Sequence, residues 1–462
     1  MADAVSGLAG ASPVPFWLDD PAAPEPEPAL VGDVTCDLVV VGAGFCGLWT
    51  ALLAKERDPA RDVVLVEART SAWAASGRNG GFVSSSLTHG LGNGAHRWPA
   101  ELTELERLGL ENLDAIEATI ERYGIDCDFE RTGKLAVATA PHEVAELRAL
   151  PDLARRHGRT IRYLAADELA VESPTFLAGA FDADGYAQVN PARLAWGLRT
   201  ACLRLGVRIH ERTPVETLTP GRRGITLRTP YGRIGARRVA LATNIFRPLL
   251  RRLALSTVPV YDYVLVTEPL TGDQLSRIGW TQRHAMSDAG NQFHYFRRTP
   301  DDRILWGGYD AVYHYGNGLA AELDQRPRTF AKLARQFAET FPPLTGIRFT
   351  HAWGGAIDTC TRFTAFYGRA HGGRTAYALG FTGLGVAATR FAAQVILDHL
   401  EGRETRRTRL RMVQDKPIPF PPEPARYAGI QLTRASLARA DTTGHRNLWL
   451  RTLDHLGLGF DS

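Results

Sequence analysis

Three glycines and one acidic residue near the N-terminus have the spacing of a dinucleotide-binding turn. Gly42, Gly44 and Gly47 follow the apolar run 38–41, and Glu67 comes twenty residues after Gly47. In such a turn the first glycine allows a tight bend, the second lets a pyrophosphate approach the backbone, and the third lets the helix pack on the strand. The acidic residue accepts hydrogen bonds from ribose hydroxyls. The pattern predicts a dinucleotide site and leaves NAD and FAD both open.

The elements on either side of this turn support that interpretation. Residues 38–41 (LVVV) and 63–66 (VVLV) are continuous apolar runs, which are typical of parallel strands buried on both faces. The free N–H groups at the start of the intervening helix form an anion site. Without a ligand, the same residues would be only a glycine-rich turn between a strand and a helix.

Two further glycine clusters lie far apart in the chain. Residues 76–82 (SGRNGGF) predict a loop rather than a helix or strand, because glycines lie on both sides of an arginine and an asparagine. Residues 380–385 (GFTGLG) lie between an expected strand at 375–379 and an expected helix at 386–399, so they repeat the order of the opening turn. A cluster such as 76–82 is also common in plain surface loops.

The composition is that of an ordinary soluble globular protein with about two or three domains. The chain has 462 residues and a net charge of +4, and so small an excess does not favour a nucleic-acid partner. Its five cysteines are odd in number and include no C-x-x-C pair, so we expect no metal site, no disulfide and a cytoplasmic location. We find no signal peptide and no apolar run long enough to span a membrane.

Alternating residues in the middle of the chain predict a second, mostly antiparallel sheet. On the expected strand 292–298, Phe293, Tyr295 and Arg297 lie on one face. Its expected neighbours are strands at 258–267 and 303–306. Short strands that follow a helix at 190–205 predict a separate small sheet packed on the nucleotide unit, with strands at 207–210, 215–218, 225–228 and 239–242.

Together these motifs resemble the FAD-dependent D-amino-acid-oxidase superfamily. The three glycine clusters are joined by Ala242-Thr243-Asn244 after an apolar strand and by Trp353-Gly354-Gly355. Within the superfamily the chain is similar to the γ-glutamylputrescine-oxidase-like group, in which S-G-R-N-G-G and W-G-G are typical. The resemblance covers residues 16–402, and the tail from Phe420 resembles an extension of some bacterial members.

The resemblance implies an α/β fold, with a Rossmann-type FAD-binding domain and a mostly antiparallel substrate-binding sheet domain of α+β type. It divides the chain into a lead-in at 1–32, a discontinuous FAD-binding domain at 33–95, 186–250 and 350–402, a substrate-binding domain at 96–185 and 251–349, and a C-terminal helical extension at 403–462.

The implied cofactor is FAD without a covalent link, because Cys360 is offset from the position at which some relatives attach their flavin. The 76–82 loop would press backbone against the flavin ring, and the helix after 380–385 would aim N–H groups at the ring edge that becomes anionic on reduction. The expected cofactor-binding residues are Gly42, Gly44, Phe45, Cys46, Gly47, Glu67, Ala68, Arg69, Ser76, Arg78, Asn79, Gly80, Gly81, Phe82, Val215, Ala242, Thr243, Gly354, Gly380, Thr382, Gly383, Leu384, Gly385 and Val386.

The implied activity is oxidation of a C–N bond in an amine or amino acid. In the family, hydride leaves the alpha carbon for flavin N5 and the imine then hydrolyses, so the protein must orient and desolvate its substrate. The expected partners are a small-molecule amine or amino acid and O2, which would give H2O2, or another electron acceptor. For the substrate pocket the resemblance indicates Arg297, Tyr309 and Trp353, with Arg297 as a carboxylate clamp. The alternatives are a surface arginine and buried aromatic core.

The sequence leaves other functions open. Some amine oxidases of this superfamily hold a lysine over the flavin, whereas the matching strand here has Leu305, and none of the four lysines falls in a flavin motif. The alternatives are a FAD-dependent dehydrogenase with a quinone or carrier acceptor, a flavoprotein hydroxylase, and a redox-inactive FAD-binding protein.

Overall fold

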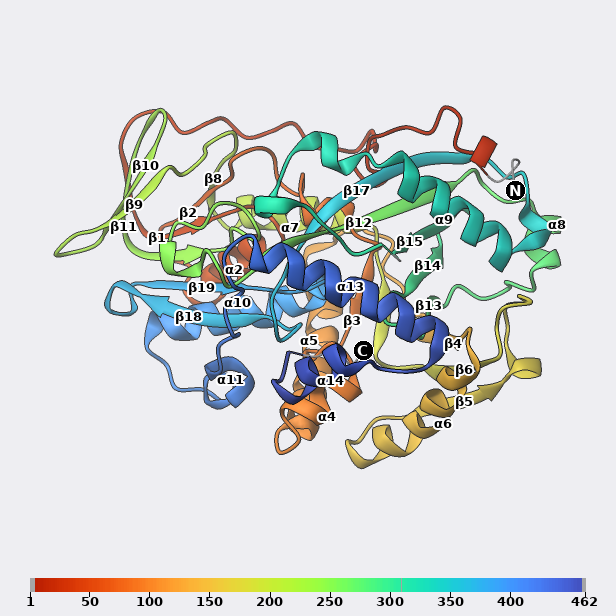
Figure 1. Cartoon of the computed structure of the whole chain (residues 1–462). Helices are drawn as coiled ribbons and strands as arrows, with labels where there is room; N and C mark the ends of the chain where they lie inside the picture. Colours follow the sequence, from red (N-terminus) through yellow and green to blue (C-terminus); the bar gives the residue numbers. More distant parts are fainter. Residues whose placement is uncertain (1–4, 309, 459–462) are drawn as a thin grey trace.

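Two large β-sheets, each built from distant parts of the sequence, organise the protein (Figure 1). The computed structural model describes residues 5–308 and 310–458. The C-terminal helix α13 (Ala425–Thr443) crosses from the side of the first sheet to the side of the second (Figure 1). Among the described residues, no helix combines the length and apolar character that a membrane crossing needs.

The eight-stranded sheet has a parallel core, in which β1 pairs with β2 and β11, and β19 pairs with β11. The predicted apolar runs 38–41 and 63–66 lie in β1 and β2 and are buried. The predicted separate small sheet is wrong: β8 pairs with β2, and β11 runs along β1, so those strands extend this sheet. The strands are β1 (Val34–Val41), β2 (Val63–Val66), β8 (Arg208–His210), β9 (Thr217–Pro220), β10 (Ile225–Thr229), β11 (Gly232–Leu241), β18 (Phe366–Ala370) and β19 (Thr375–Leu379).

Helices α2 (Phe45–Arg57) and α10 (Gly385–Glu401) pack against each other and are buried over most of their lengths. Each follows the carboxyl end of a parallel strand, β1 or β19. Because the carboxyl ends of parallel strands meet at one edge of a sheet, both helix N-termini lie at that edge. The two glycine turns that were 330 residues apart in sequence are therefore brought to one place.

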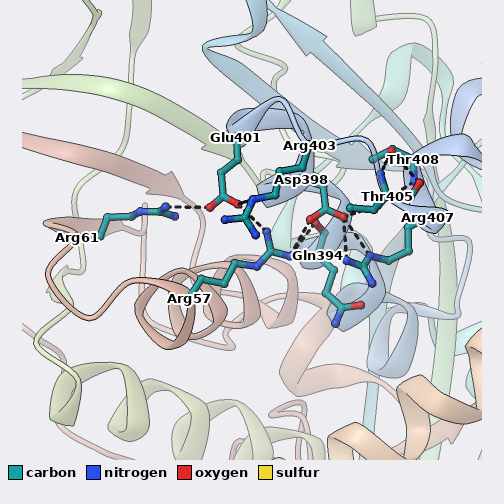
Figure 2. A network of polar contacts seen from close by, with 9 residues as sticks. All are labelled: Arg57, Arg61, Gln394, Asp398, Glu401, Arg403, Thr405, Arg407 and Thr408. Carbon is teal, nitrogen blue, oxygen red and sulfur yellow. Dashed lines mark hydrogen bonds and ion pairs between the residues drawn. The ribbon is translucent and has the colours of Figure 1, made fainter.

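An ion-pair network ties the C-terminal ends of these two helices together (Figure 2). Arg57 at the end of α2 contacts Asp398 at 2.9 Å and Glu401 at 3.1 Å near the end of α10. Arg61 binds Glu401 at 2.9 Å, and Arg407 binds Asp398 at 2.9 Å. The side chain of Asp398 is only 1% exposed, so its charge depends on these partners. The network helps to hold the C-terminal ends of the two helices together.

The nine-stranded sheet is mostly antiparallel and packs over an aromatic core that includes Trp280, Trp306 and Phe341. β17 pairs with β12 along its whole length, and the predicted division of the chain into domains, with 350–402 in the FAD-binding unit, stays a prediction. The strands are β4 (Lys134–Ala138), β5 (Ile161–Ala165), β6 (Ala178–Asp182), β12 (Val258–Thr267), β13 (Ala285–Asp288), β14 (His294–Arg298), β15 (Ile304–Gly308), β16 (Val312–Tyr313) and β17 (Phe349–Thr359).

The remaining elements connect the two sheets or cover their faces. β3 and β7 form a two-stranded ribbon, and α9 covers the aromatic core of the second sheet. These elements are α3 (Ala75–Arg78), β3 (Phe82–Ser84), α4 (Leu91–Arg97), α5 (Leu102–Tyr123), α6 (Pro141–Arg156), β7 (Tyr186–Gln188), α7 (Pro191–Arg204), α8 (Gly272–Arg277), α9 (Pro327–Thr340), α11 (Arg406–Arg409), α12 (Arg411–Gln414) and α14 (Leu448–His455).

Candidate active site

A single cavity of about 1880 Å³ takes its lining from both sheets and from the C-terminal helices. Ordinary small-molecule sites have about 300–1,000 Å³, so this cavity has room for more than one ligand. One part is lined by the turns before α2 and α10, and another by β12, β14 and α13. We call these the cofactor end and the far end.

The turn before α2 has the geometry that the glycine spacing predicted. Gly42 has a φ of +108°, and a Cβ added there would lie 2.5 Å from the carbonyl oxygen of Ala242. A Cβ on Gly47 would lie 1.8 Å from the Gly42 carbonyl oxygen, so only glycine allows this helix–strand approach. The hydroxyl of Ser76 accepts the N–H of Phe45 at 2.9 Å. The other N–H groups of this first turn have no acceptor within the helix and suit an anion.

Glu67 lies at the end of β2 on the cavity wall and is almost completely buried. Its carboxylate accepts the N–H of Ala43 at 2.8 Å, the N–H of Arg69 at 3.0 Å and the indole N–H of Trp73 at 2.9 Å. Burial raises the pKa of Glu67, and these three donors oppose the rise. An anionic oxygen held here is suited to ribose hydroxyls.

The 76–82 segment differs from the expected loop at both ends. Residues 75–78 form the one-turn helix α3, and Phe82 begins β3. The side chain of Asn79 closes the segment on itself, since it donates to the carbonyl of Ala75 at 2.9 Å and accepts the N–H of Gly81 at 2.8 Å. The segment is therefore a braced wall of the cavity.

Two predicted pocket residues, Arg297 and Trp353, form hydrogen bonds with the 76–82 segment and do not face the cavity. The Nη1 of Arg297 donates to the carbonyls of Gly81 at 3.1 Å and Val189 at 2.7 Å, and the indole N–H of Trp353 donates to the carbonyl of Arg78 at 3.0 Å. Both side chains are fully buried, and neither lines the cavity. The third predicted pocket residue, Tyr309, lies outside the described residues.

The turn before α10 also lines the cofactor end of the cavity. Thr382 has a φ of +49°, which is uncommon for a residue other than glycine. Nε2 of His89 lies 3.0 Å from the Thr382 carbonyl, and burial lowers the pKa of His89 to about 4, so its ring is neutral at pH 7. Asp358 accepts the N–H of Gly380 at 2.6 Å, and burial raises the pKa of this aspartate to about 7.

Most of the predicted cofactor residues line the cavity. Gly47, Gly81, Gly354 and Gly380 do not, and a Cβ added to any of them would lie less than 3 Å from a neighbouring backbone or side-chain atom. Those on the wall are Gly42, Gly44, Phe45, Cys46, Glu67, Ala68, Arg69, Ser76, Arg78, Asn79, Gly80, Phe82, Val215, Ala242, Thr243, Thr382, Gly383, Leu384, Gly385 and Val386.

The sequence analysis missed several residues of the far end. Asp262 on β12 and Tyr295 on β14 line it and share a hydrogen bond of 2.6 Å. Lys134 also lines the cavity, although it belongs to no flavin motif. The alternation of 292–298 had already placed Tyr295 on one face, but only the packing of the sheets turns that face to the cavity.

The C-terminal extension forms the roof of the far end. Residues spaced three or four apart along α13, including Ile430, Thr433 and Leu437, line the cavity, and Trp449 of α14 joins them. The carboxylate of Asp441 on α13 accepts the backbone N–H of Asn291 at 2.8 Å and thereby attaches the helix to the loop before β14. The C-terminal extension therefore forms part of the cavity wall.

The cavity residues fit FAD, since two helix N-termini suit a pyrophosphate and a flavin edge, and the buried Glu67 suits a ribose. The model for the family described as FAD dependent oxidoreductase matches residues 37–399. The chain belongs to this family. The cofactor of this FAD-dependent oxidoreductase is FAD, and the predicted fold class, resemblance and enzyme class are confirmed. Cys360 lies behind the wall, with its Sγ 3.1 Å from the carbonyl of Thr364, which agrees with non-covalent binding.

Known relatives align with most of the sequence of this oxidoreductase. Gamma-glutamylputrescine oxidoreductase of Escherichia coli (strain K12) is 30% identical over 379 residues, which cover 80% of this chain and 84% of the relative. The probable oxidoreductase OrdL of Haemophilus influenzae is 25% identical over 383 residues, with coverage of 80% and 84%. Glycine oxidase from Geobacillus kaustophilus shares the fold, with a TM-score of 0.66 and 20% identity over 81% of this chain and 96% of its own.

Proposed function

We propose that this enzyme oxidises the C–N bond of an amine or amino acid and passes the electrons to O2, giving H2O2. The similarity to gamma-glutamylputrescine oxidoreductase over 80% of the chain carries the amine part of this proposal. The large cavity supports it, because the far end leaves space for a substrate beside the cofactor end.

FAD, when bound, supplies the chemistry by accepting a hydride at N5 from the carbon next to nitrogen. The wall residues of the two turns and Glu67 would hold it, with Val215 at the adenine side. The roof formed by α13 and the apolar wall of β12 would exclude water from the substrate. The imine product needs no further catalyst, since it hydrolyses in water.

Anaerobic titration of the purified protein with a panel of amines and amino acids tests the proposal. At least one amine should bleach the flavin, which is seen as a loss of its visible absorbance. A protein that binds FAD but is bleached by none of them would overturn the proposal and favour a redox-inactive FAD-binding protein.

A dehydrogenase with a quinone or carrier acceptor is the second candidate. The sequence resemblance matches Leu305 on β15 to the position at which some amine oxidases of the superfamily hold a lysine, and the Leu305 side chain is completely buried. An oxygen electrode and a peroxide assay separate the two candidates. Bleaching by an amine without oxygen consumption in air would favour the dehydrogenase.

A further inference from the structure

The wall that β12 contributes to the cavity carries one carboxylate in an otherwise apolar row. Alternate residues of this strand line the cavity, namely Val258, Val260, Asp262 and Val264, and Tyr261 joins them. A carboxylate taken from water into such a row is costly unless opposite charge or hydrogen-bond donors compensate for the lost hydration. The presence of Asp262 in this row therefore requires an explanation.

The protein compensates Asp262 only in part. The hydroxyl of Tyr295 donates to its Oδ2 at 2.6 Å, and the backbone N–H of Tyr263 donates to its Oδ1 at 2.8 Å. The backbone N–H of Gly308 also stabilises this carboxylate, and all three donors are neutral. Within residues 5–308 and 310–458 no lysine or arginine forms an ion pair with Asp262. Two other carboxylates of the cavity wall do have such a partner, since Asp182 pairs with Arg159 and Asp324 pairs with Arg78. Glu67 and Asp358, like Asp262, are held by neutral N–H donors.

The Asp262–Tyr295 pair lies beside the segment that braces the cofactor end. The rings of Tyr295 and Phe82 are in edge contact, with centroids 5.7 Å apart. A Cβ added to Gly80 would lie 2.8 Å from the Tyr295 ring. A ligand group on Asp262 would therefore lie in the substrate space next to the proposed flavin wall.

We propose that Asp262, held by Tyr295, binds a cationic nitrogen of the substrate that is not the nitrogen oxidised. This inference rests on the proposed function in taking the substrate to be an amine. The nitrogen next to the oxidised carbon must be neutral, because its lone pair stabilises that carbon as the hydride leaves. A carboxylate favours the protonated form of a bound amine, so it suits a second nitrogen. The substrate class is therefore a diamine, with one neutral and one ammonium nitrogen.

The ionisation of Asp262 gives this site a pH dependence. Burial raises the pKa of Asp262 to about 6, while Tyr295 and backbone N–H groups oppose the rise. His294 on β14 also lowers this pKa, and among residues 5–308 and 310–458 the strands β15 and β17 place Gly308 and Gly355 beside it. Binding of a cation should strengthen as the pH rises through about 6, since the carboxylate becomes charged there.

Calorimetric titration of the FAD-loaded enzyme with tert-butylammonium chloride tests the site. This cation has no hydrogen on the carbon next to nitrogen, so it is not oxidised, and tert-butanol is its neutral counterpart. At pH 8 the wild type should bind the cation at least about tenfold more tightly than the alcohol, as expected for one partly buried charge pair. Asp262→Asn should lose this preference, and Tyr295→Phe should shift the pH midpoint upward.

Glu146→Gln serves as the matched control, because Glu146 is an exposed carboxylate on the cavity wall. It should keep the preference for the cation. Equal flavin content and thermal midpoint in all variants exclude unfolding as a cause. The site is overturned if Asp262→Asn retains the preference of the wild type for the cation.

Turnover of 1,4-diaminobutane and butylamine tests the second nitrogen. The wild type should prefer the diamine in kcat/KM by about tenfold, and Asp262→Asn should remove that preference. An unchanged ratio would overturn the diamine assignment. Failure of every amine to bleach the flavin, with cation binding still dependent on Asp262, would refute the proposed function alone. Bleaching with cation binding independent of Asp262 would refute the site alone.

Discussion

The two ends of the cavity are built in different ways. At the cofactor end, short contiguous motifs present backbone N–H groups from the starts of α2 and α10, and Glu67 adds one buried carboxylate. At the far end, side chains from β12, β14, α6 and the C-terminal helices meet from distant parts of the sequence. The first end is specified by backbone geometry and the second by side-chain identity.

This difference separates cofactor binding from substrate choice. A backbone cradle depends on a few glycines and on the packing of two helices, so most side chains near it can vary without loss of the cofactor. A wall of side chains can change its ligand by a single substitution, as Asp262 within a row of valines illustrates. The following variants test whether the two ends are in fact independent.

Gly47→Val should have the largest effect and should abolish flavin binding. A Cβ at this position would lie 1.8 Å from the Gly42 carbonyl oxygen, so α2 must move away from β1. We expect a destabilisation of at least about 3 kcal/mol and no flavin-loaded protein, measured by thermal melting and by absorbance of the purified protein. Gly92→Ala is the control, because a Cβ there meets no atom within 4 Å. Flavin-loaded Gly47→Val would contradict the backbone argument.

Asp398→Ala should destabilise the fold without changing the affinity of the folded protein for FAD. The substitution leaves Arg57 and Arg407 without their buried partner, which costs about 3–5 kcal/mol in the free energy of unfolding, measured with urea. Glu404→Ala removes a carboxylate that is 86% exposed and should cost less than about 0.5 kcal/mol. Weaker FAD binding by folded Asp398→Ala would mean that the network also positions the helix N-termini.

Glu67→Gln should weaken FAD binding about 10- to 100-fold. The amide would offer the ribose hydroxyls one neutral acceptor oxygen in place of two anionic ones, and the loss of one hydrogen bond to a charged group costs about 1.5–3 kcal/mol. Quenching of flavin fluorescence measures the dissociation constant. Glu216→Gln, at an exposed carboxylate, should leave it unchanged. An unaltered constant in Glu67→Gln would remove this residue from the cofactor site.

Leu437→Lys should have the smallest effect and should act on the far end alone. The new charge on the cavity face of α13 should weaken tert-butylammonium binding about fivefold, as expected for a repulsion of about 1 kcal/mol, while the FAD dissociation constant stays the same. Leu432→Lys lies on the same helix at a residue that is 48% exposed and should change neither value. Loss of FAD from Leu437→Lys would show that the two ends are coupled.

The cofactor end was predictable because the residues within each of its turns are close in sequence, and because each glycine of the first turn has one steric reason. The far end was not. Alternation placed Tyr295 and Arg297 on one face, but it could not show that Tyr295 reaches Asp262 while Arg297 is buried against Gly81. Likewise, periodicity alone could not place Trp353 against the 76–82 segment, because that contact joins β17 to residues 275 positions earlier in the chain.

The sequence by itself determined the strand–turn–helix units, since these depend on local spacing and backbone conformation, and its resemblance to a known family implied FAD. Only the tertiary structure decided which side chains share the cavity. It brought the turns at 42–47 and 380–385 to one edge, turned Asp262 toward the substrate space and laid α13 over it. These outcomes depend on how strands pair and helices pack across hundreds of residues, and a pattern within one segment does not contain that information.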